Sequence, residues 1–126
     1  MSETPLKRVG PSARHGAGTW KAERWTSVAL VPLTLWGLWS AGQLAGGGYD
    51  AAALWLKQPL NAGLLILTLA ISAWHAVMGL RVIIEDYLHG GLGVFMLRLV
   101  TLFGWLLFFA GAVAVAFVFL GLELGA

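Results

Sequence analysis

The sequence lacks cysteine and has few charged residues. Without cysteine, the 126-residue chain cannot form disulfides, thiolate metal sites or Cys-ligated iron–sulfur clusters. Only 11% of its residues are charged, whereas soluble domains carry about 25%. Hydrophobic residues make up 59%, more than a soluble domain of this size can bury, and disorder requires the opposite composition. The composition therefore predicts a membrane protein, and seven tryptophans suit a chain that meets two membrane interfaces.

The few basic residues are unevenly placed. Five of the eight precede the first long apolar run: Lys7, Arg8, Arg14, Lys21 and Arg24. A nucleic-acid-binding protein needs a basic stripe with interleaved aromatic residues on a soluble face. Basic residues that flank an apolar run are instead typical of the cytoplasmic side of a membrane protein. We therefore expect no nucleic-acid partner and a cytoplasmic N-terminal tail.

Long apolar runs predict an all-α membrane protein with three transmembrane helices. The runs cover about residues 26–45, 60–86 and 94–122. The shortest has about 20 residues, enough to cross a hydrocarbon core of roughly 30 Å. Pro32 falls in the first turns of the first run, where its missing N–H costs least. Pro59 suits the first turn of the second run, and Gly90-Gly91 is a strong stop after it.

The segments outside the runs are expected to be short or loose. Residues 1–25 should form a loose cytoplasmic tail, with room for a short interfacial helix around 19–24. Residues 46–58 should link the first two spans, with one amphipathic turn through 51–56. The transmembrane domain would then cover 26–126.

The distribution of charge predicts the orientation. With the N-terminus in the cytoplasm, only Lys57 lies on the outer side. The other basic residues lie on or near the cytoplasmic side: Lys7, Arg8, Arg14, Lys21, Arg24, Arg81 and Arg98. Because cytoplasmic loops carry an excess of Lys and Arg, we expect the N-terminus inside and the C-terminus outside.

His75 is the main candidate for chemistry. It lies 11 residues before Asp86, or about 16 Å from the end of the second run at 1.5 Å per residue, close to the bilayer midplane. An ionisable side chain at that depth is costly and suggests a function. Neutral imidazole is a common ligand of haem iron. The alternative is an interhelical hydrogen bond from His75 to a Ser, a Thr or a carbonyl.

The neighbours of His75 favour the ligand interpretation. Gly79, Val82 and Asp86 share its helix face, and Gly79 leaves room for a flat macrocycle or another backbone, although ordinary helix packing would also use a glycine there. A six-coordinate haem needs a second axial ligand. We expect it from a partner subunit, because His15 and His89 are not at membrane depth.

Asp86-Tyr87 lies where the second run leaves the membrane on the cytoplasmic side. The phenol can donate a hydrogen bond to a carbonyl oxygen, and the neighbouring carboxylate can relay protons at the water boundary. A lipid quinone requires both, beside an apolar slot. The alternative is an interfacial aromatic next to a solvated helix end.

Two arginines flank this region. Arg81 can pair with Glu85 four residues later or extend toward the headgroups, and it projects away from the His75 face. Arg24 precedes the first span, where it serves as a positive-inside anchor or reaches an anionic group such as a haem propionate.

The pattern His75-(x3)-Gly79-(x6)-Asp86-Tyr87 resembles the signature of the small hydrophobic anchor subunits of succinate:quinone oxidoreductase (succinate dehydrogenase, complex II), in their alphaproteobacterial form. The start of the first run, residues 24–33, is similar to the Arg-x-Thr-Ala-Val-Ala-Leu opening of that family. The size, the three spans and the cytoplasmic tail agree with the same family. The resemblance covers nearly the whole chain.

The resemblance implies roles for particular residues. His75 would be one axial ligand of haem b, and Tyr87 would hydrogen-bond a ubiquinone carbonyl. Asp86 would support that site or its proton supply, and Arg24 would lie near the haem propionates or the quinone pocket. Arg81 departs from the family, which is expected to have a less charged residue there.

The resemblance also implies partners and a location. The chain would be half of a six-helix anchor bundle in the bacterial inner membrane, completed by a second anchor protein of cytochrome b556 type, and it would dock an iron–sulfur and a flavoprotein subunit. Electrons from succinate would pass to ubiquinone in the respiratory chain and tricarboxylic acid cycle, with succinate itself handled elsewhere. The alternatives are an anchor of another quinone-linked enzyme, such as fumarate reductase, and a non-redox structural or assembly protein in which His75 joins helices.

Overall fold

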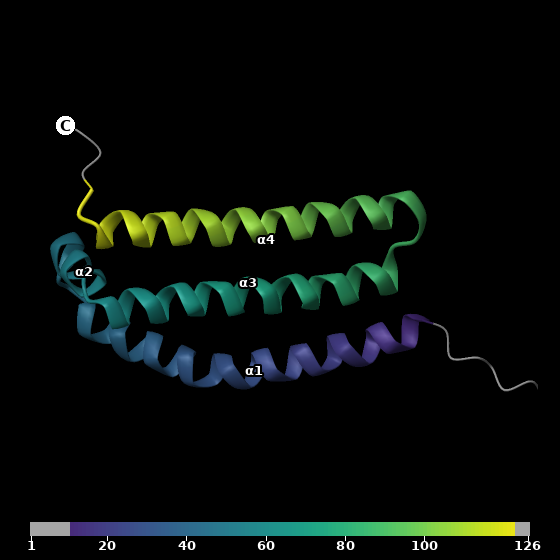
Figure 1. The fold of residues 1–126 in the computed structure, drawn as a ribbon, viewed down its shortest axis with the longest axis horizontal. Coiled ribbons are helices and arrows are strands. Elements are labelled where there is room, and N and C mark those ends of the chain that lie inside the picture. Colours follow the sequence, from purple (N-terminus) through teal and green to yellow (C-terminus); the bar gives the residue numbers. More distant parts are fainter. Residues whose placement is uncertain (1–10, 123–126) are drawn as a thin grey trace, which may run out of the picture.

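The computed structural model describes residues 11–122, and all of its regular structure in that range is helical (Figure 1). The elements are α1 (Pro11–Leu44), α2 (Gly48–Leu56), α3 (Pro59–Tyr87) and α4 (Gly90–Phe119). Three long helices lie side by side and α2 lies across one end of them. The predicted all-α class is confirmed.

Helices α3 and α4 are each long and apolar enough to cross a membrane. They have 29 and 30 residues, which is about 44 Å at 1.5 Å per residue. Only 6% and 11% of their most apolar stretches are buried, so they are not the core helices of a soluble domain. Pro59 is the first residue of α3, as predicted, because its missing N–H has no partner in a first turn anyway.

Helix α1 differs from the expected boundary. Residues 11–25 continue the first apolar run as one 34-residue helix, where a loose tail was expected. Pro11 at the first position and several good helix formers before Trp25 favour this conformation. The remainder of the expected tail, residues 1–10, lies outside the described residues. Ser, Thr, Gln and Gly dilute the apolar run of α1, so it is not among the described helices that are apolar enough to cross a membrane. A third span and the orientation of the chain therefore remain predictions.

Pro32 consequently lies in the interior of α1, not in its first turns. A proline there has no N–H to donate to the carbonyl of Val28, and its ring crowds that carbonyl. Such positions commonly bend helices, and α1 is visibly bowed in Figure 1.

Glycines bring α3 and α4 close together. A Cβ built on Gly104 would overlap the side chain of Val77, and one built on Gly111 would lie 2.9 Å from Cδ1 of Leu69. The Gly104–Val77 and Gly111–Leu69 contacts are separated by a similar number of turns on each of the two antiparallel helices. Both contacts therefore belong to the same helix–helix interface. The absence of side chains at these positions is what lets the two helices form a tight hairpin.

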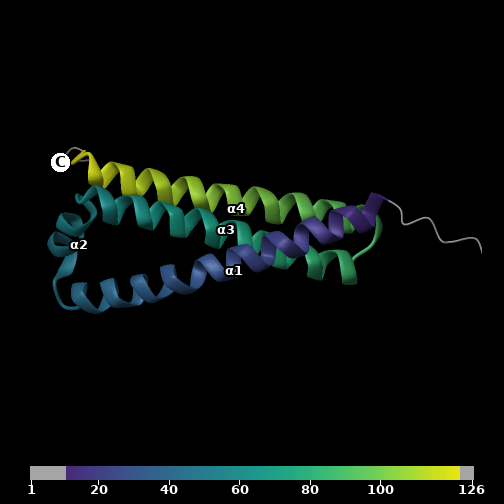
Figure 2. The same ribbon diagram turned by 60° about the horizontal axis from the view of Figure 1, so that its bottom comes forward.

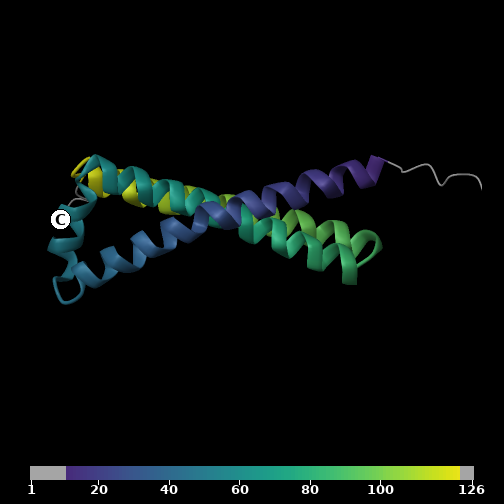
Figure 3. The same cartoon turned by 90° about the horizontal axis from the view of Figure 1, so that it is seen from below.

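Helix α1 packs on α3 and not on α4 within the described residues. It crosses α3 obliquely and diverges from the hairpin toward the end that α2 closes (Figures 2 and 3). Trp36 of α1 stacks on Trp55 of α2 with ring centroids 5.5 Å apart, and the Asn61 amide donates to the Trp55 carbonyl at 3.1 Å. These contacts fix α2 between α1 and α3.

The outer surface of the helices is strongly apolar. Trp25 is 73% exposed and Trp39 is 70% exposed, whereas the buried hydrophobic residues of the described chain are few: Leu33, Ala62, Met78, Ile84 and Val115. Such a surface is unsuitable for water and suits lipid tails or neighbouring helices. The chain is therefore a membrane protein.

Candidate functional site

His75 lies in the middle of α3, half-buried, and faces α1. Its Nδ1 atom is 3.0 Å from the hydroxyl oxygen of Thr26. This is the kind of interhelical hydrogen bond that one interpretation of the sequence predicted. It occupies one ring nitrogen, and none of the side chains that the structure describes, in residues 20–122, is a hydrogen-bond partner of Nε2.

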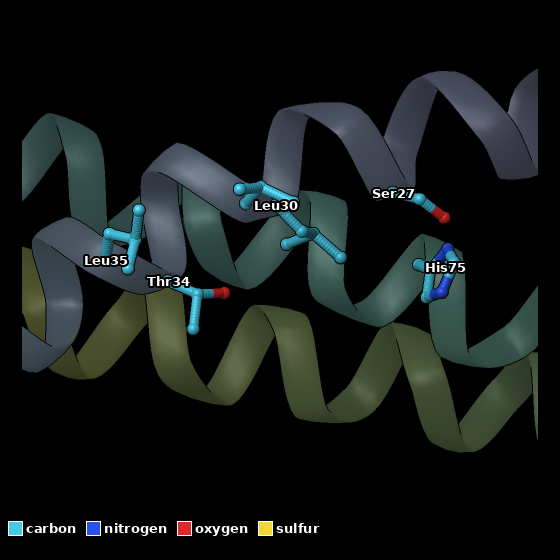
Figure 4. A pocket seen from close by; sticks show the side chains of 6 residues that line it. Ser27, Leu30, Thr34, Leu35 and His75 are labelled. Carbon is cyan, nitrogen blue, oxygen red and sulfur yellow. The ribbon is translucent and has the colours of Figure 1, made fainter.

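An open groove of about 390 Å³ runs beside the imidazole between α1 and α3. Its lining residues are Ser27, Leu30, Val31, Thr34, Leu35 and His75. The α1 residues form two rows with four-residue spacing: Ser27, Val31 and Leu35 in one row, and Leu30 and Thr34 in the other. The two rows are adjacent on one face of the helix. Figure 4 shows the Ser27 hydroxyl and the His75 ring facing each other at one end of the groove.

Gly79 extends the open space on the His75 face. It lies one turn beyond His75 toward the end of α3, and a Cβ built on it would meet no atom within 4 Å. Glycine is therefore not required there by packing within this chain, in contrast to Gly104 and Gly111. The space beside Gly79 is therefore not filled by any described residue.

Asp86 and Tyr87 are the last two residues of α3. Both side chains are exposed, and Tyr87 is 80% exposed. Neither makes a hydrogen bond or an ion pair with another described residue. Tyr87 is 12 residues from His75, or about 18 Å along the helix axis, so the two side chains lie well apart on one helix.

Arg24 lies on α1, two residues before Thr26, or about 3 Å along the axis. Its guanidinium carbon is 4.9 Å from the ring centroid of Trp20, a cation–π arrangement that holds the side chain against its own helix. Because α1 and α3 are antiparallel (Figure 1), Arg24 lies on the Tyr87 side of His75. Along the helix axis it is nearer to His75 than to Tyr87.

Arg81 pairs with Glu85, as predicted, at 3.9 Å. Both side chains are more than half exposed, and such surface pairs typically contribute about 0–1 kcal/mol. They line a second groove of about 690 Å³ formed mainly by α3 and α4, with Trp74, Trp105 and Phe108 in its walls. Arg81 therefore faces away from the His75 groove.

The sequence interpretation did not identify Thr26 as the partner of His75. The available signal for this partner was a hydroxyl at the start of the first apolar run. Thr26, Leu30 and Thr34 also have the four-residue spacing of one helix face. Among the side chains that the structure describes, in residues 20–122, no three of His, Asp or Glu gather as a metal site. An iron at His75 would take its other ligands from groups outside the described residues.

Comparison with known proteins places the chain in a family. The family model described as succinate dehydrogenase/fumarate reductase transmembrane subunit matches residues 3–119. No solved structure gives a significant match.

Three relatives illustrate the similarity. The succinate dehydrogenase hydrophobic membrane anchor subunit of Rickettsia conorii is 35% identical over 78 residues, covering 61% of this chain and 62% of the relative. The Rickettsia typhi protein of the same name is 31% identical over 88 residues, with 70% of each chain covered. The succinate dehydrogenase membrane anchor subunit of Reclinomonas americana is 26% identical over 96 residues, covering 71% of this chain and 80% of the relative. Because the family match spans most of the sequence, this chain belongs to the succinate dehydrogenase/fumarate reductase transmembrane subunits.

Proposed function

We propose that this chain is the hydrophobic membrane anchor of a succinate dehydrogenase complex, and that it binds haem b through His75 and ubiquinone through Tyr87. The observation that carries the proposal is the half-buried imidazole in mid-helix, which borders an open apolar groove and leaves Nε2 without a partner among the described residues. The names of the Rickettsia relatives support the assignment to this complex.

The residues around His75 fit one side of a haem. Neutral imidazole is a common axial ligand, and the groove offers an apolar wall in Leu30, Val31 and Leu35. The open space at Gly79 leaves room for the edge of a flat ring. Arg24, close to the level of His75, would pair with a propionate. When bound, haem b supplies reversible one-electron transfer.

Tyr87 and Asp86 have the chemistry that quinone reduction requires. The exposed phenol would donate a hydrogen bond to a ring carbonyl and hold it as negative charge develops. The exposed Asp86 carboxylate would carry protons from water to the same region. The quinone is the substrate, and its apolar tail would lie along the exposed hydrophobic surface of the bundle.

The incompleteness of the His75 groove supports a partner in the membrane. The groove is walled on one side by α1 and α3 and is open on the other, so a second anchor protein of cytochrome b556 type would close it and supply a further ligand for the haem. In this arrangement the two chains form a six-helix bundle in the bacterial inner membrane. The iron–sulfur and flavoprotein subunits would dock at the Tyr87 end on the cytoplasmic side, and Arg24, Arg81 and Arg98 all lie on the Tyr87 side of His75.

The reduced-minus-oxidised visible spectrum of the purified complex tests the proposal. We expect a b-type haem signal that is lost or strongly perturbed in His75→Ala and unchanged in His89→Ala, since His89 lies in the link between α3 and α4. A wild-type spectrum in His75→Ala would contradict the ligand assignment.

A second role for His75 follows from its bond to Thr26. If His75 served only to join α1 and α3, His75→Ala would lower the stability of the complex and leave the haem spectrum intact. The family description also includes fumarate reductase. The ratio of succinate oxidation to fumarate reduction in membranes would distinguish the two enzymes.

A further inference from the structure

We infer that Thr26 is a positioning residue that fixes the tautomer and the ring orientation of His75, so that Nε2 presents its lone pair to haem iron. The inference rests on the proposed haem site and adds a residue to it. Its basis is a chain of hydrogen bonds from the α1 backbone through the Thr26 hydroxyl to Nδ1 of His75.

The first step concerns the Thr26 hydroxyl hydrogen. The oxygen lies 2.8 Å from the carbonyl oxygen of Ala22 and 3.0 Å from that of Glu23. Both carbonyls can only accept, and a hydroxyl has a single hydrogen to donate. Donation to the carbonyl four residues earlier is a common arrangement for threonine in a helix. The hydroxyl hydrogen is therefore directed at the α1 backbone.

The second step concerns His75. Because the Thr26 hydrogen points to the backbone, its oxygen faces Nδ1 with a lone pair at 3.0 Å. The ring nitrogen must then be the donor. A neutral imidazole carries one N–H, so a hydrogen on Nδ1 leaves the lone pair on Nε2. In the opposite arrangement, the Thr26 hydroxyl would donate to Nδ1 and the imidazole hydrogen would lie on Nε2. Nε2 could then not bind iron, and the Thr26 oxygen would face the two backbone carbonyls without a hydrogen to donate to them.

The third step concerns orientation. The Thr26 side chain is held by its own backbone bond, and it sits on a different helix from His75. The imidazole is therefore held at Cβ by α3 and at Nδ1 by α1. Partners of this kind orient metal-binding histidines and strengthen the other nitrogen as a donor, and their loss typically weakens metal binding by about 10- to 100-fold.

The test compares three variants of the whole complex. Thr26→Val removes the hydroxyl at nearly constant volume, and Thr26→Ser keeps it. Thr68→Val is the matched control, because the Thr68 hydroxyl donates to the carbonyl of Leu64 at 2.7 Å in the same way and makes no bond to His75. The measurements are the haem content per complex during detergent washing and the haem midpoint potential by optical redox titration.

We expect Thr26→Val to bind haem with an affinity about 10- to 100-fold lower than that of the wild type. The haem midpoint potential should rise in this variant, because a weaker donor nitrogen stabilises ferric iron less. Thr26→Ser and Thr68→Val should keep both values near wild type. Equal behaviour of Thr26→Val and Thr26→Ser, or equal haem loss in Thr68→Val, would overturn the inference. Full haem retention in His75→Ala would overturn the proposed ligand itself, so a failure of Thr26 alone remains distinguishable from a failure of the haem site.

Discussion

The Nδ1 atom of His75 and the hydroxyl oxygen of Thr26 lie 3.0 Å apart and are 49 residues apart in the sequence. This contact links α3 to α1. A structural bond and a ligand role were alternatives for His75 when only the sequence was considered. The geometry makes them compatible, because the bond uses one ring nitrogen and the groove lies beside the ring.

Replacing Tyr87 with Phe should impair quinone reduction. The phenol is 80% exposed and has no partner among the described residues, so its removal costs the fold little. A hydrogen bond to a substrate carbonyl contributes about 0.5–1.5 kcal/mol net, so kcat/KM for a ubiquinone analogue should fall by about 2- to 12-fold. Succinate oxidation with an artificial acceptor should stay at the wild-type rate.

Tyr49→Phe is the matched control for this substitution. Tyr49 is the other tyrosine of the chain, it is 75% exposed, and it lies on α2 at the opposite end of the bundle. The control should leave both assays unchanged. Identical quinone kinetics in the two variants would count against a quinone site at Tyr87.

The helices after residue 48 follow local signals in the sequence. Pro59 begins α3 because a first turn tolerates a missing N–H, and the extended residues Leu88 and His89 separate α3 from α4 beside the Gly pair that was predicted to end the run. The short helix α2 extends the expected amphipathic turn. Residues 11–25 could not be assigned in the same way, because basic residues before a span indicate a side of the membrane and carry little information about conformation.

In the candidate site, too, local signals could be interpreted and contacts between distant segments could not. The depth of His75 within an apolar run was enough to make it a candidate, and the position at the end of a run made Asp86 and Tyr87 candidates. Thr26 could not be paired with His75 in advance, because the pairing depends on the crossing point of two helices that are distant in sequence. The role of Gly79 also needed the three-dimensional arrangement, which distinguishes a glycine in open space from one that a neighbouring helix requires.

Replacing Gly104 with Val should destabilise the α3–α4 hairpin. A Cβ at this position would overlap the Val77 side chain, and overpacking of this kind costs about 1–3 kcal/mol. We expect a lower melting temperature of the complex in detergent and a lower yield from membranes.

Gly63→Val serves as the comparison for Gly104→Val. Gly63 is also in a long helix, but a Cβ there meets no atom within 4 Å. Its substitution should be neutral or slightly stabilising, since glycine is the poorer helix former by roughly a few tenths of a kcal/mol. Equal melting temperatures for the two variants would show that Gly104 is not needed for close packing.

Gly79→Leu should reduce haem content without weakening the fold of this chain. The position has open space around it, and leucine is a better helix former than glycine by about 0.8 kcal/mol. However, Gly79 shares the helix face of His75, so a leucine would project into the space that the proposed haem or the partner helix occupies. Haem per complex and retention of the second anchor protein on purification are the measurements. Gly63→Leu introduces the same side chain at another open glycine of α3, twelve residues before His75, and should change neither value. If Gly79→Leu matched that control, nothing outside this chain could be packing against the His75 face at Gly79.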